Sequence, residues 1–344
     1  MVKQTVGLKT LAAHLNVTVG TVSRALNGYS DISEATRLRV LRAADELGYR
    51  PNHAARRLST GVAEAVAYVM PQYSSSISQP FVGQLLKGLG EAVAKRGWDL
   101  LVAHADSAKD ELNHLDRLVR SGRVGGLVIS RPAKNDPRIR LMRSLKCPFV
   151  VHGRTADCRD YAWYDVDGAD AFHTAVDHLV TLGHGRIAFV GAPLQYQFAQ
   201  DRLNGYRAAL EQNGLRAVPE FVQITEFSDD GGELATNVLL DLDQPPSAIV
   251  CISDMVALGA LAAIRARGLT PGRDISVIGY DGLKVGQHAN PPLTTMAQPQ
   301  VHAGRRLGDI LLAIIDGGDP RDYQDLQKAH LLRRKTDGAF EQTT

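Results

Sequence analysis

The sequence contains little of what anchors, exports or cross-links a protein. No hydrophobic run in its 344 residues approaches the roughly 18 apolar residues of a membrane span, and the first residues lack the apolar core of a secretory signal. Cys147, Cys158 and Cys251 are odd in number and in no CxxC spacing, which favours reduced thiols over a zinc site. These absences predict a cytoplasmic protein without a membrane partner.

The common catalytic motifs are also missing. The sequence contains no GxxxxGK[ST], HExxH or GxSxG motif, and no GxGxxG follows an expected strand. Residues 165–168 (DVDG) resemble the start of a calcium loop but lack its remaining ligands and its closing Glu. The eleven histidines are dispersed. We therefore expect no enzyme activity, no metal site and no cofactor.

Charge is distributed unevenly along the chain. The whole chain carries +2, but residues 1–60 hold nine Lys or Arg and four Asp or Glu, a balance of +5 that leaves −3 for the remainder. A small basic module on a larger acidic body indicates a polyanion partner, although a solvated charged face would give the same balance. The length allows two or three domains, and 44% hydrophobic residues are typical of globular proteins.

The basic module is expected to fold as three short helices. The apolar spacing predicts helices over residues 7–14 and 19–26, and residues 32–36 open a third. Thr18 and Ser33 are candidate N-caps for the second and third helices. Two helices joined by about three residues form the helix-turn-helix arrangement.

The two faces of the second helix differ in chemistry. Val22 and Leu26 form its buried stripe. The other face carries short polar side chains and one long bidentate donor, which suit base edges and phosphates, although an ordinary surface helix would look similar. These polar residues are Thr21, Ser23, Arg24 and Asn27.

Residues 52–58 (NHAARRL) follow Pro51 as a short, basic stretch that ends in an isolated Leu. Helices this short are marginal on their own. We expect a linker that orders only when it is docked on a partner.

The order and spacing of these residues resemble the lactose/galactose repressor (LacI/GalR) family of bacterial transcription regulators. The resemblance rests on residues 21–28 (TVSRALNG), 32–37 (ISEATR), 46–52 (ELGYRPN) and 55–58 (ARRL). It implies that the second helix lies in the major groove, and that a hinge helix forms on DNA and pairs with its dimer mate. Leu58 would be the wedge in the minor groove, and Ala55 would face the mate.

The resemblance also implies a set of DNA-binding residues. Val19 and Gly20 stand at the positions that usually choose bases, and both are poor in polar atoms, which makes the operator sequence hard to guess. The whole set is Thr18, Val19, Gly20, Thr21, Ser23, Arg24, Asn27, Ser33, Thr36, Tyr49, Asn52, Ala55, Arg56 and Leu58.

From Glu64 onward, apolar strands alternate with helical segments, which predicts two doubly wound parallel sheets with a ligand cleft between two lobes. The expected strands are 65–70, 100–103, 126–129, 149–151, 187–190, 222–225, 248–251, 277–279 and 294–297, with a last extended piece over 326–332. The expected helices are 81–95, 112–119, 139–145, 171–182, 200–213, 233–242, 256–267 and 301–315.

The resemblance extends over this body, for example at 182–191 (LGHGRIAFVG) and 274–281 (DISVIGYD), and implies a fold similar to periplasmic sugar-binding proteins. The expected fold class is thus a small all-α helix-turn-helix head followed by two-lobed α/β. The expected domains are a head over 1–50, a hinge helix and linker over 51–62, and an effector-binding and dimerisation domain over 63–344. Its N-lobe takes about 63–164 and 298–322, and its C-lobe takes about 165–297 and 323–335.

Seven residues are candidates for effector binding, chosen from expected strand ends and from the family's positions. Arg202, placed between a strand and a helix, and Asp281 would offer a fork of donors and a carboxylate to sugar hydroxyls. Phe227 would stack on the sugar. Asp254 is either a contact or a helix N-cap. Ser253, Gln298 and Arg154 complete the set, and for each residue a surface ion pair or cap is the alternative.

One position departs from the family pattern. Many members carry Asp-Asn after the lobe crossing, whereas this chain has Asp167-Gly168, which puts a capping or hinge role there in doubt. Residues 152–155 (HGRT) and 201–206 (DRLNGY) are similar to the branch associated with glycoside or disaccharide operons.

These observations together predict a sugar- or glycoside-responsive repressor that acts as a homodimer on a pseudo-palindromic operator in double-stranded DNA. A corepressor-dependent regulator with a non-sugar effector stays open. So do a sugar-binding receptor without DNA function and an α/β enzyme with an accessory DNA module. Residues 333–344 contain no Leu heptad, so nothing indicates a coiled-coil tetramer.

Overall fold

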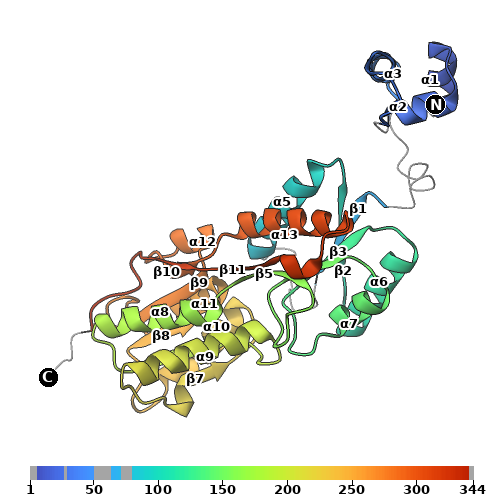
Figure 1. Cartoon of the computed structure of the whole chain (residues 1–344). Helices are drawn as coiled ribbons and strands as arrows, with labels where there is room; N and C mark the ends of the chain where they lie inside the picture. Colours follow the sequence, from blue (N-terminus) through green and yellow to red (C-terminus); the bar gives the residue numbers. More distant parts are fainter. Residues whose placement is uncertain (1–5, 27–28, 50–62, 71–79, 341–344) are drawn as a thin grey trace. The chain divides into compact units, whose positions relative to one another are not determined.

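The computed structural model describes residues 6–26, 29–49, 63–70 and 80–340, and they belong to two compact units, 1–63 and 64–344 (Figure 1). The first unit is helical. The second contains two six-stranded sheets. Among the described residues, every helix is too short or too polar to span a bilayer.

The first unit contains α1 (Leu8–Leu15), α2 (Val19–Leu26) and α3 (Glu34–Glu46) around a small apolar core. Both predicted caps are formed. Thr18 Oγ1 accepts a hydrogen bond from the Thr21 amide at 3.0 Å, and Ser33 Oγ accepts one from the Thr36 amide at 3.3 Å. Each cap satisfies an amide that the first helical turn leaves unpaired, which is why α2 and α3 begin where they do.

The core of this unit is narrower than the pattern suggests. Val22 is fully buried, and Val40 and Ala44 are buried on α3. Leu41, which the apolar spacing places on the same side, is 46% exposed. A helix rotates by about 100° per residue, and this rotation turns Leu41 out of the face that Val40 buries.

The first sheet is entirely parallel, with strand order β11-β5-β4-β3-β1-β2. Its strands are β1 (Ala65–Met70), β2 (Asp99–His104), β3 (Gly126–Ser130), β4 (Phe149–His152), β5 (Ala162–Val166) and β11 (Gln324–Gln327). Alternate residues of β1 point to opposite faces. Tyr68 packs with α5 (Pro80–Ala94) and α13 (Gln300–Ile315), whereas Val69 packs with α6 (Ala108–Arg120) and α7 (Pro137–Ser144).

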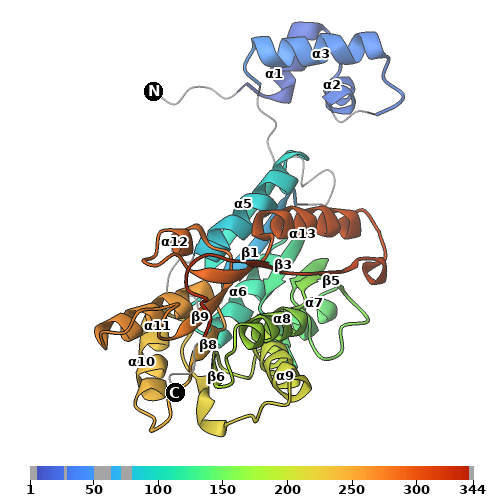
Figure 2. The ribbon, with the colours of Figure 1, turned by 90° about the vertical axis from the view of Figure 1, so that its left-hand side faces the viewer.

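The second sheet has strand order β12-β10-β9-β8-β6-β7. Its strands are β6 (Ile187–Gly191), β7 (Val222–Ile224), β8 (Ala248–Cys251), β9 (Ser276–Asp281), β10 (Thr294–Ala297) and β12 (His330–Leu332), of which only β12 runs antiparallel to its neighbour. Four helices cover it: α8 (Gly168–Thr181), α9 (Gln197–Gln212), α10 (Asp229–Leu240) and α11 (Asp254–Ala266). Helices α8 and α9 pack on one side and α10 and α11 on the other (Figure 2), and the short α12 (Lys284–Gln287) follows β9.

The chain crosses between the sheets after β5, after β10 and after β11. We call the first sheet with its helices the first lobe, and the second sheet with its helices the second lobe. The predicted two-lobed, doubly wound α/β fold is therefore confirmed.

The sequence pattern was wrong at two places. Strand β5 was not expected, and the single extended piece over 326–332 is two strands that belong to different sheets. Strand β11, which was assigned to the C-lobe, pairs with β5 in the first sheet. Its sequence, Gln-Asp-Leu-Gln, is polar because the strand lies at an exposed sheet edge, so apolar periodicity could not reveal its partner.

Candidate functional site

A cleft lies between the two lobes of the second unit. Its open space, including the solvent at its mouth, is about 640 Å³. Five of the seven candidate effector residues line this cleft: Arg154, Arg202, Phe227, Asp281 and Gln298. Ser253 and Asp254 do not.

Arg202 lies inside α9, in agreement with the helix expected over 200–213, so its expected place between a strand and a helix was wrong. Its Nη1 donates to the Ile252 carbonyl at 2.7 Å, and its guanidinium lies 3.8 Å from the centre of the Tyr280 ring. Its buried Nε makes no hydrogen bond within the described residues. A buried donor without a partner is costly, so a ligand acceptor here would relieve a penalty as well as add a bond.

Asp281 is the last residue of β9 and has a φ of 126°, which is uncommon for a residue other than glycine. Its side chain lines the cleft. Its Oδ1 accepts a hydrogen bond from Gln298 Nε2 at 2.7 Å. Burial raises the pKa of Asp281 to about 6, against the lowering effect of the nearby Arg202. A carboxylate held in this way can accept hydroxyl hydrogens from a ligand.

Arg154 forms an ion pair with Asp165, a cleft residue that the sequence analysis did not select. The Arg154 Nε lies 2.8 Å from Asp165 Oδ2. Burial raises the pKa of Asp165, and the hydrogen bond from Arg154 opposes this effect. This ion pair gives the cleft a donor and an acceptor in addition to Arg202 and Asp281.

Phe227 contributes an aromatic wall. The Arg131 guanidinium lies 4.8 Å from its ring centre, and the Phe198 ring meets it edge-to-face at 6.1 Å. Aromatic faces suit the apolar side of a sugar ring, whereas the surrounding polar groups suit its hydroxyls. The predicted aromatic position is thus part of the cleft.

Ser253 and Asp254 have structural partners instead. Ser253 Oγ caps α11 by accepting from the Val256 amide at 3.3 Å. The fully buried Asp254 accepts from the Leu283 amide and from Thr295 Oγ1, both at 2.6 Å. Burial, reinforced by the charge of Asp281, raises the pKa of Asp254 to about 7. The structure gives these two residues no direct place in the cleft.

Several cleft residues were missed, among them Arg131 and His152. Both stand at the carboxyl ends of parallel strands, Arg131 just after β3 and His152 at the end of β4, so the rule that found Asp281 could have found them. Burial, followed by the charge of Arg131, lowers the pKa of His152 to about 4, so its ring is neutral. Phe81 and Phe198 lie at helix beginnings and carry no comparable signal.

The departure at 167–168 does not remove the helix cap. Asp167 Oδ1 accepts from the Asp170 amide at 3.1 Å and caps α8. Gly168 lines the cleft beside Arg202. The missing Asn side chain therefore changes the cleft and leaves the cap intact.

In the first unit, α2 presents a surface of mixed chemistry. Val19 is 40% exposed, and Gly20 and Arg24 are exposed beside it. The Arg24 Nη2 lies 2.5 Å from Asp31 Oδ2, and its guanidinium lies 5.3 Å from the Tyr29 ring centre. Arg24 is thus held at the surface by the loop that follows α2.

The other candidate DNA-binding residues fall into three groups. The hydroxyls of Thr18 and Ser33 serve as caps and also bond those of Thr21 and Thr36. Ser23 and Tyr49 are half-buried in the first unit, Tyr49 against its core. Asn27, Asn52, Ala55, Arg56 and Leu58 lie outside the described residues, so the hinge prediction is not tested.

The first unit presents a helix-turn-helix, and the second is a two-lobed α/β unit with a polar cleft. This combination is typical of a ligand-controlled regulator. Residues 8–52 match the bacterial regulatory proteins of the lacI family, and residues 63–331 match the periplasmic binding proteins and sugar binding domain of the LacI family. The chain belongs to the LacI family of DNA-binding transcriptional regulators.

Three relatives place it within the family. The HTH-type transcriptional regulator AglR of Rhizobium meliloti (strain 1021) is 38% identical, over 97% of this chain and 94% of AglR. The structure of a CelR–cellobiose complex matches with 31% identity and a TM-score of 0.75, over 96% of this chain and 99% of CelR. A lac repressor dimer bound to operator and the anti-inducer ONPF matches with 28% identity and a TM-score of 0.84, over 98% and 100%. These relatives are regulators, not enzymes.

Proposed function

We propose that this chain is a sugar- or glycoside-responsive repressor that acts as a dimer on a pseudo-palindromic operator in the bacterial cytoplasm. The observation that carries the proposal is that one cleft is lined by Arg202 of α9, by Asp281 at the end of β9 with its hydrogen-bond partner Gln298, and by aromatic side chains. It combines donors and acceptors that grip neighbouring hydroxyls with rings that cover an apolar face.

The polar groups favour a sugar over an apolar effector. Arg202 Nε is a buried donor without a hydrogen bond to the described residues, and Asp281 presents a buried carboxylate whose Oδ1 accepts from Gln298. An apolar ligand would leave these groups desolvated and unpaired, which costs about 1–3 kcal/mol for each group. A ligand rich in hydroxyls would satisfy them.

The proposed dimer and its pseudo-palindromic operator are inferred from the small size of the DNA-binding unit. One short recognition helix makes few phosphate and base contacts, and two copies on a pseudo-palindrome double them. The relative seen as a dimer on its operator, the lac repressor, supports this arrangement, and the CelR–cellobiose complex supports a sugar in the cleft. Effector binding would shift the two lobes, change the spacing of the hinges and so change DNA affinity.

The test is DNA binding to the promoter region beside the chain's own gene, measured by mobility shift at fixed salt with a panel of mono- and disaccharides. Loss of the complex with one sugar is the expected result. A complex that forms only with an added ligand would replace the repressor by a corepressor system. A complex that is indifferent to every sugar overturns the sugar assignment, and no complex at all points to a receptor without DNA function.

A matched pair of variants locates the site. Arg202→Ala should bind DNA with unchanged affinity and lose the response to the sugar. Arg207→Ala removes an exposed Arg from the same helix and should respond as the wild type does. An Arg202→Ala protein that still responds would remove Arg202 from the effector site.

A further inference from the structure

A short loop of the first lobe reaches the second lobe through its backbone. The Lys134 amide donates to the Gln195 carbonyl at 3.3 Å, and the Gln197 amide donates to the Pro132 carbonyl at 3.2 Å. Ala133 and Tyr196 thereby form an isolated antiparallel bridge between the lobes. We call residues 131–135 the bridging loop.

The same loop supplies a wall of the cleft. Arg131 has a φ of 51°, which is uncommon for a residue other than glycine and turns the chain sharply after β3. Its guanidinium lies 4.8 Å from the ring centre of Phe227 on the second lobe and 6.0 Å from that of Phe81 on the first. Movement of the bridging loop would therefore alter the cleft and the contact between the lobes together.

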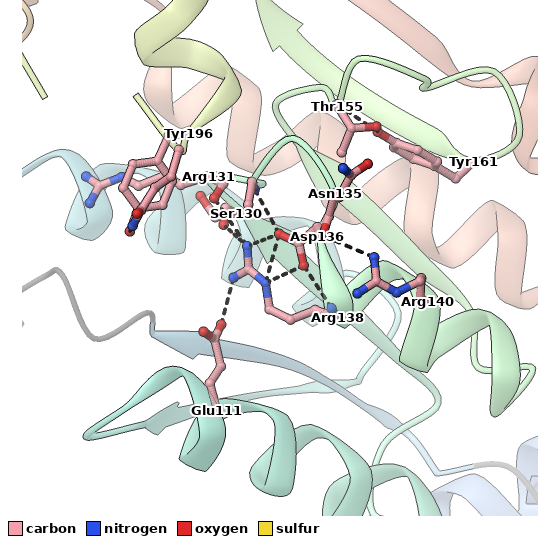
Figure 3. A network of polar contacts seen from close by, with 12 residues as sticks. Glu111, Ser130, Arg131, Asn135, Asp136, Arg138, Arg140, Thr155, Tyr161 and Tyr196 are labelled. Carbon is pink, nitrogen blue, oxygen red and sulfur yellow. Dashed lines mark hydrogen bonds and ion pairs between the residues drawn. The ribbon is translucent and has the colours of Figure 1, made fainter. Parts of the chain in front are cut away.

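Arg138, on α7, is hydrogen-bonded to the backbone at the start of this loop (Figure 3). Its Nη2 donates to the carbonyls of Ser130 and Arg131, at 3.1 and 3.2 Å, on both sides of the turn. Asp136 accepts from Arg138 Nε at 3.0 Å and also from the Ala133 amide at 3.0 Å. One guanidinium thus fixes the start of the loop directly and its middle through Asp136.

The charged groups around Arg138 are buried and hydrogen-bonded to one another. Glu111 of α6 accepts from Arg138 Nη1 at 2.7 Å, and the side chains of Arg138, Glu111 and Asp136 are only 9%, 7% and 1% exposed. Burial raises the pKa of Glu111. Burial also acts on Asp136, but the hydrogen bonds and charge of Arg138, together with the Ala133 amide, outweigh it and lower the pKa of Asp136. Buried charges of this kind tolerate little displacement, because each lost bond leaves a desolvated group.

We propose that Arg138, held by Glu111 and Asp136, is a positioning residue that keeps the bridging loop against the second lobe and thereby sets how readily the effector cleft closes. This inference rests on the proposed function, because it concerns the response of the same cleft. Arg138 does not line the cleft, so it acts through Arg131 and the loop backbone.

A purely local role is the alternative. Asp136 also caps α7 through the Arg138 amide, at 2.8 Å, so the network could serve only to begin that helix. A local role predicts effects confined to the first lobe. A positioning role predicts a change at residues 195–200, which belong to the second lobe and contact the bridging loop, not Arg138.

The test is hydrogen exchange in the ligand-free full chain, comparing the wild type with Arg138→Lys. Lysine keeps the charge, but its single ammonium cannot reach both carboxylates and both carbonyls at once. Exchange in a peptide covering 195–200 should become about tenfold faster, since the Gln197 amide loses its partner. Exchange in β6 should stay slow and report an intact second lobe.

The chain offers a matched control in the same lobe. Arg96 forms a bidentate pair with Asp316, with Nη1 to Oδ2 at 2.6 Å, and does not line the cleft. Arg96→Lys should leave exchange over 195–200 unchanged. Unchanged exchange there in a folded Arg138→Lys protein, or an equal increase in the control, overturns the proposal.

A milder variant covers the case in which Arg138→Lys fails to fold. Glu111→Gln keeps an oxygen acceptor for Arg138 but removes one charge, and it should raise exchange over 195–200 by a smaller factor. No increase in that variant overturns the proposal.

Effector affinity separates this inference from the proposed function. If a saccharide binds the wild type, Arg138→Lys should weaken it by about tenfold, a typical size for a coupling between sites. An unchanged affinity would overturn the positioning role. If no saccharide binds the wild type, the proposed function fails, and the exchange experiment still decides the role of Arg138.

Discussion

The backbone of Gly168 lies directly against the side chain of Arg202. A Cβ atom at residue 168 would stand 3.0 Å from Arg202 Cγ and 3.4 Å from its Nε. Arg202 cannot easily give way, because its Nη1 is bonded to the Ile252 carbonyl and its guanidinium lies on Tyr280. The glycine that breaks the family pattern therefore makes room for the Arg202 side chain.

We predict that Gly168→Ala lowers both stability and effector affinity. The added Cβ would press on an Arg202 side chain that cannot easily give way, so the thermal midpoint should fall. The displaced Arg202 should bind the effector several-fold more weakly. Calorimetric titration and thermal unfolding of the same samples measure both quantities.

Gly90→Ala is the control for this prediction. Gly90 lies within α5, where an added Cβ would meet only Leu100 Cδ2, at an ordinary 3.9 Å. Its stability should rise without a change in effector affinity. If Gly168→Ala binds as tightly as the wild type, then the contact with Arg202 does not shape the site.

Effector affinity should depend on pH through Asp281. Burial raises its pKa to about 6, from an ordinary value near 3.8, so the carboxylate is mostly ionised at pH 7 and mostly protonated at pH 5. The ionised carboxylate only accepts hydrogen bonds, whereas the protonated acid turns one of its oxygens into a donor, so affinity should fall about tenfold between pH 7 and pH 5. Titration across this range checks it, and a flat profile would argue that Asp281 does not accept hydrogen bonds from the ligand.

The stability of the second lobe should have the opposite dependence on pH. Asp254 has a pKa of about 7 in the folded chain and an ordinary value of 3.8, so between these values the folded state binds more protons than the unfolded state. The contribution of Asp254 to stability is then complete below about pH 4, falls between about pH 4 and pH 7 by up to about 1.4 kcal/mol per pH unit, and levels off at higher pH.

Asp254→Asn should flatten that dependence. The amide oxygen can still accept from the Leu283 amide, and the amide nitrogen can donate to Thr295 Oγ1, so both bonds of the wild type have a counterpart. Urea unfolding at pH 5 and pH 7.5 should show a smaller difference in the variant than in the wild type. A variant with the slope of the wild type would assign the pH dependence to other groups.

The sequence predicted most of what depends on local patterns. Alternating apolar segments located most strands and helices of both lobes, and the caps Thr18 and Ser33 needed only their own helix turns to be recognised. The strand-end rule found Asp281 because the rule concerns topology, which periodicity reveals. Applied consistently, it would also have found Arg131 and His152.

Long-range partners could not be read from the sequence in the same way. Asp254 follows a strand just as a ligand contact would, but Leu283 and Thr295, which are distant in sequence, hold its carboxylate away from the cleft. The polar edge strand β11 joins the first sheet through backbone bonds, which leave no pattern in the side chains. Spacing describes which face a residue occupies and says little about what meets that face.

Arg24 is the sharpest test of the DNA-binding face. In the free chain it is paired with Asp31, and both side chains are about half exposed. An exposed pair of this kind contributes at most about 1 kcal/mol, so a guanine or a phosphate can replace Asp31 at little cost. Arg24→Ala should weaken specific operator binding by about 1–3 kcal/mol, with a smaller loss on unrelated DNA if the contact is bidentate to guanine.

Arg42→Ala removes an exposed Arg from α3 and serves as the charge control. Equal losses on operator and unrelated DNA would place Arg24 on a phosphate, whereas a loss no larger than that of Arg42→Ala would remove it from the interface.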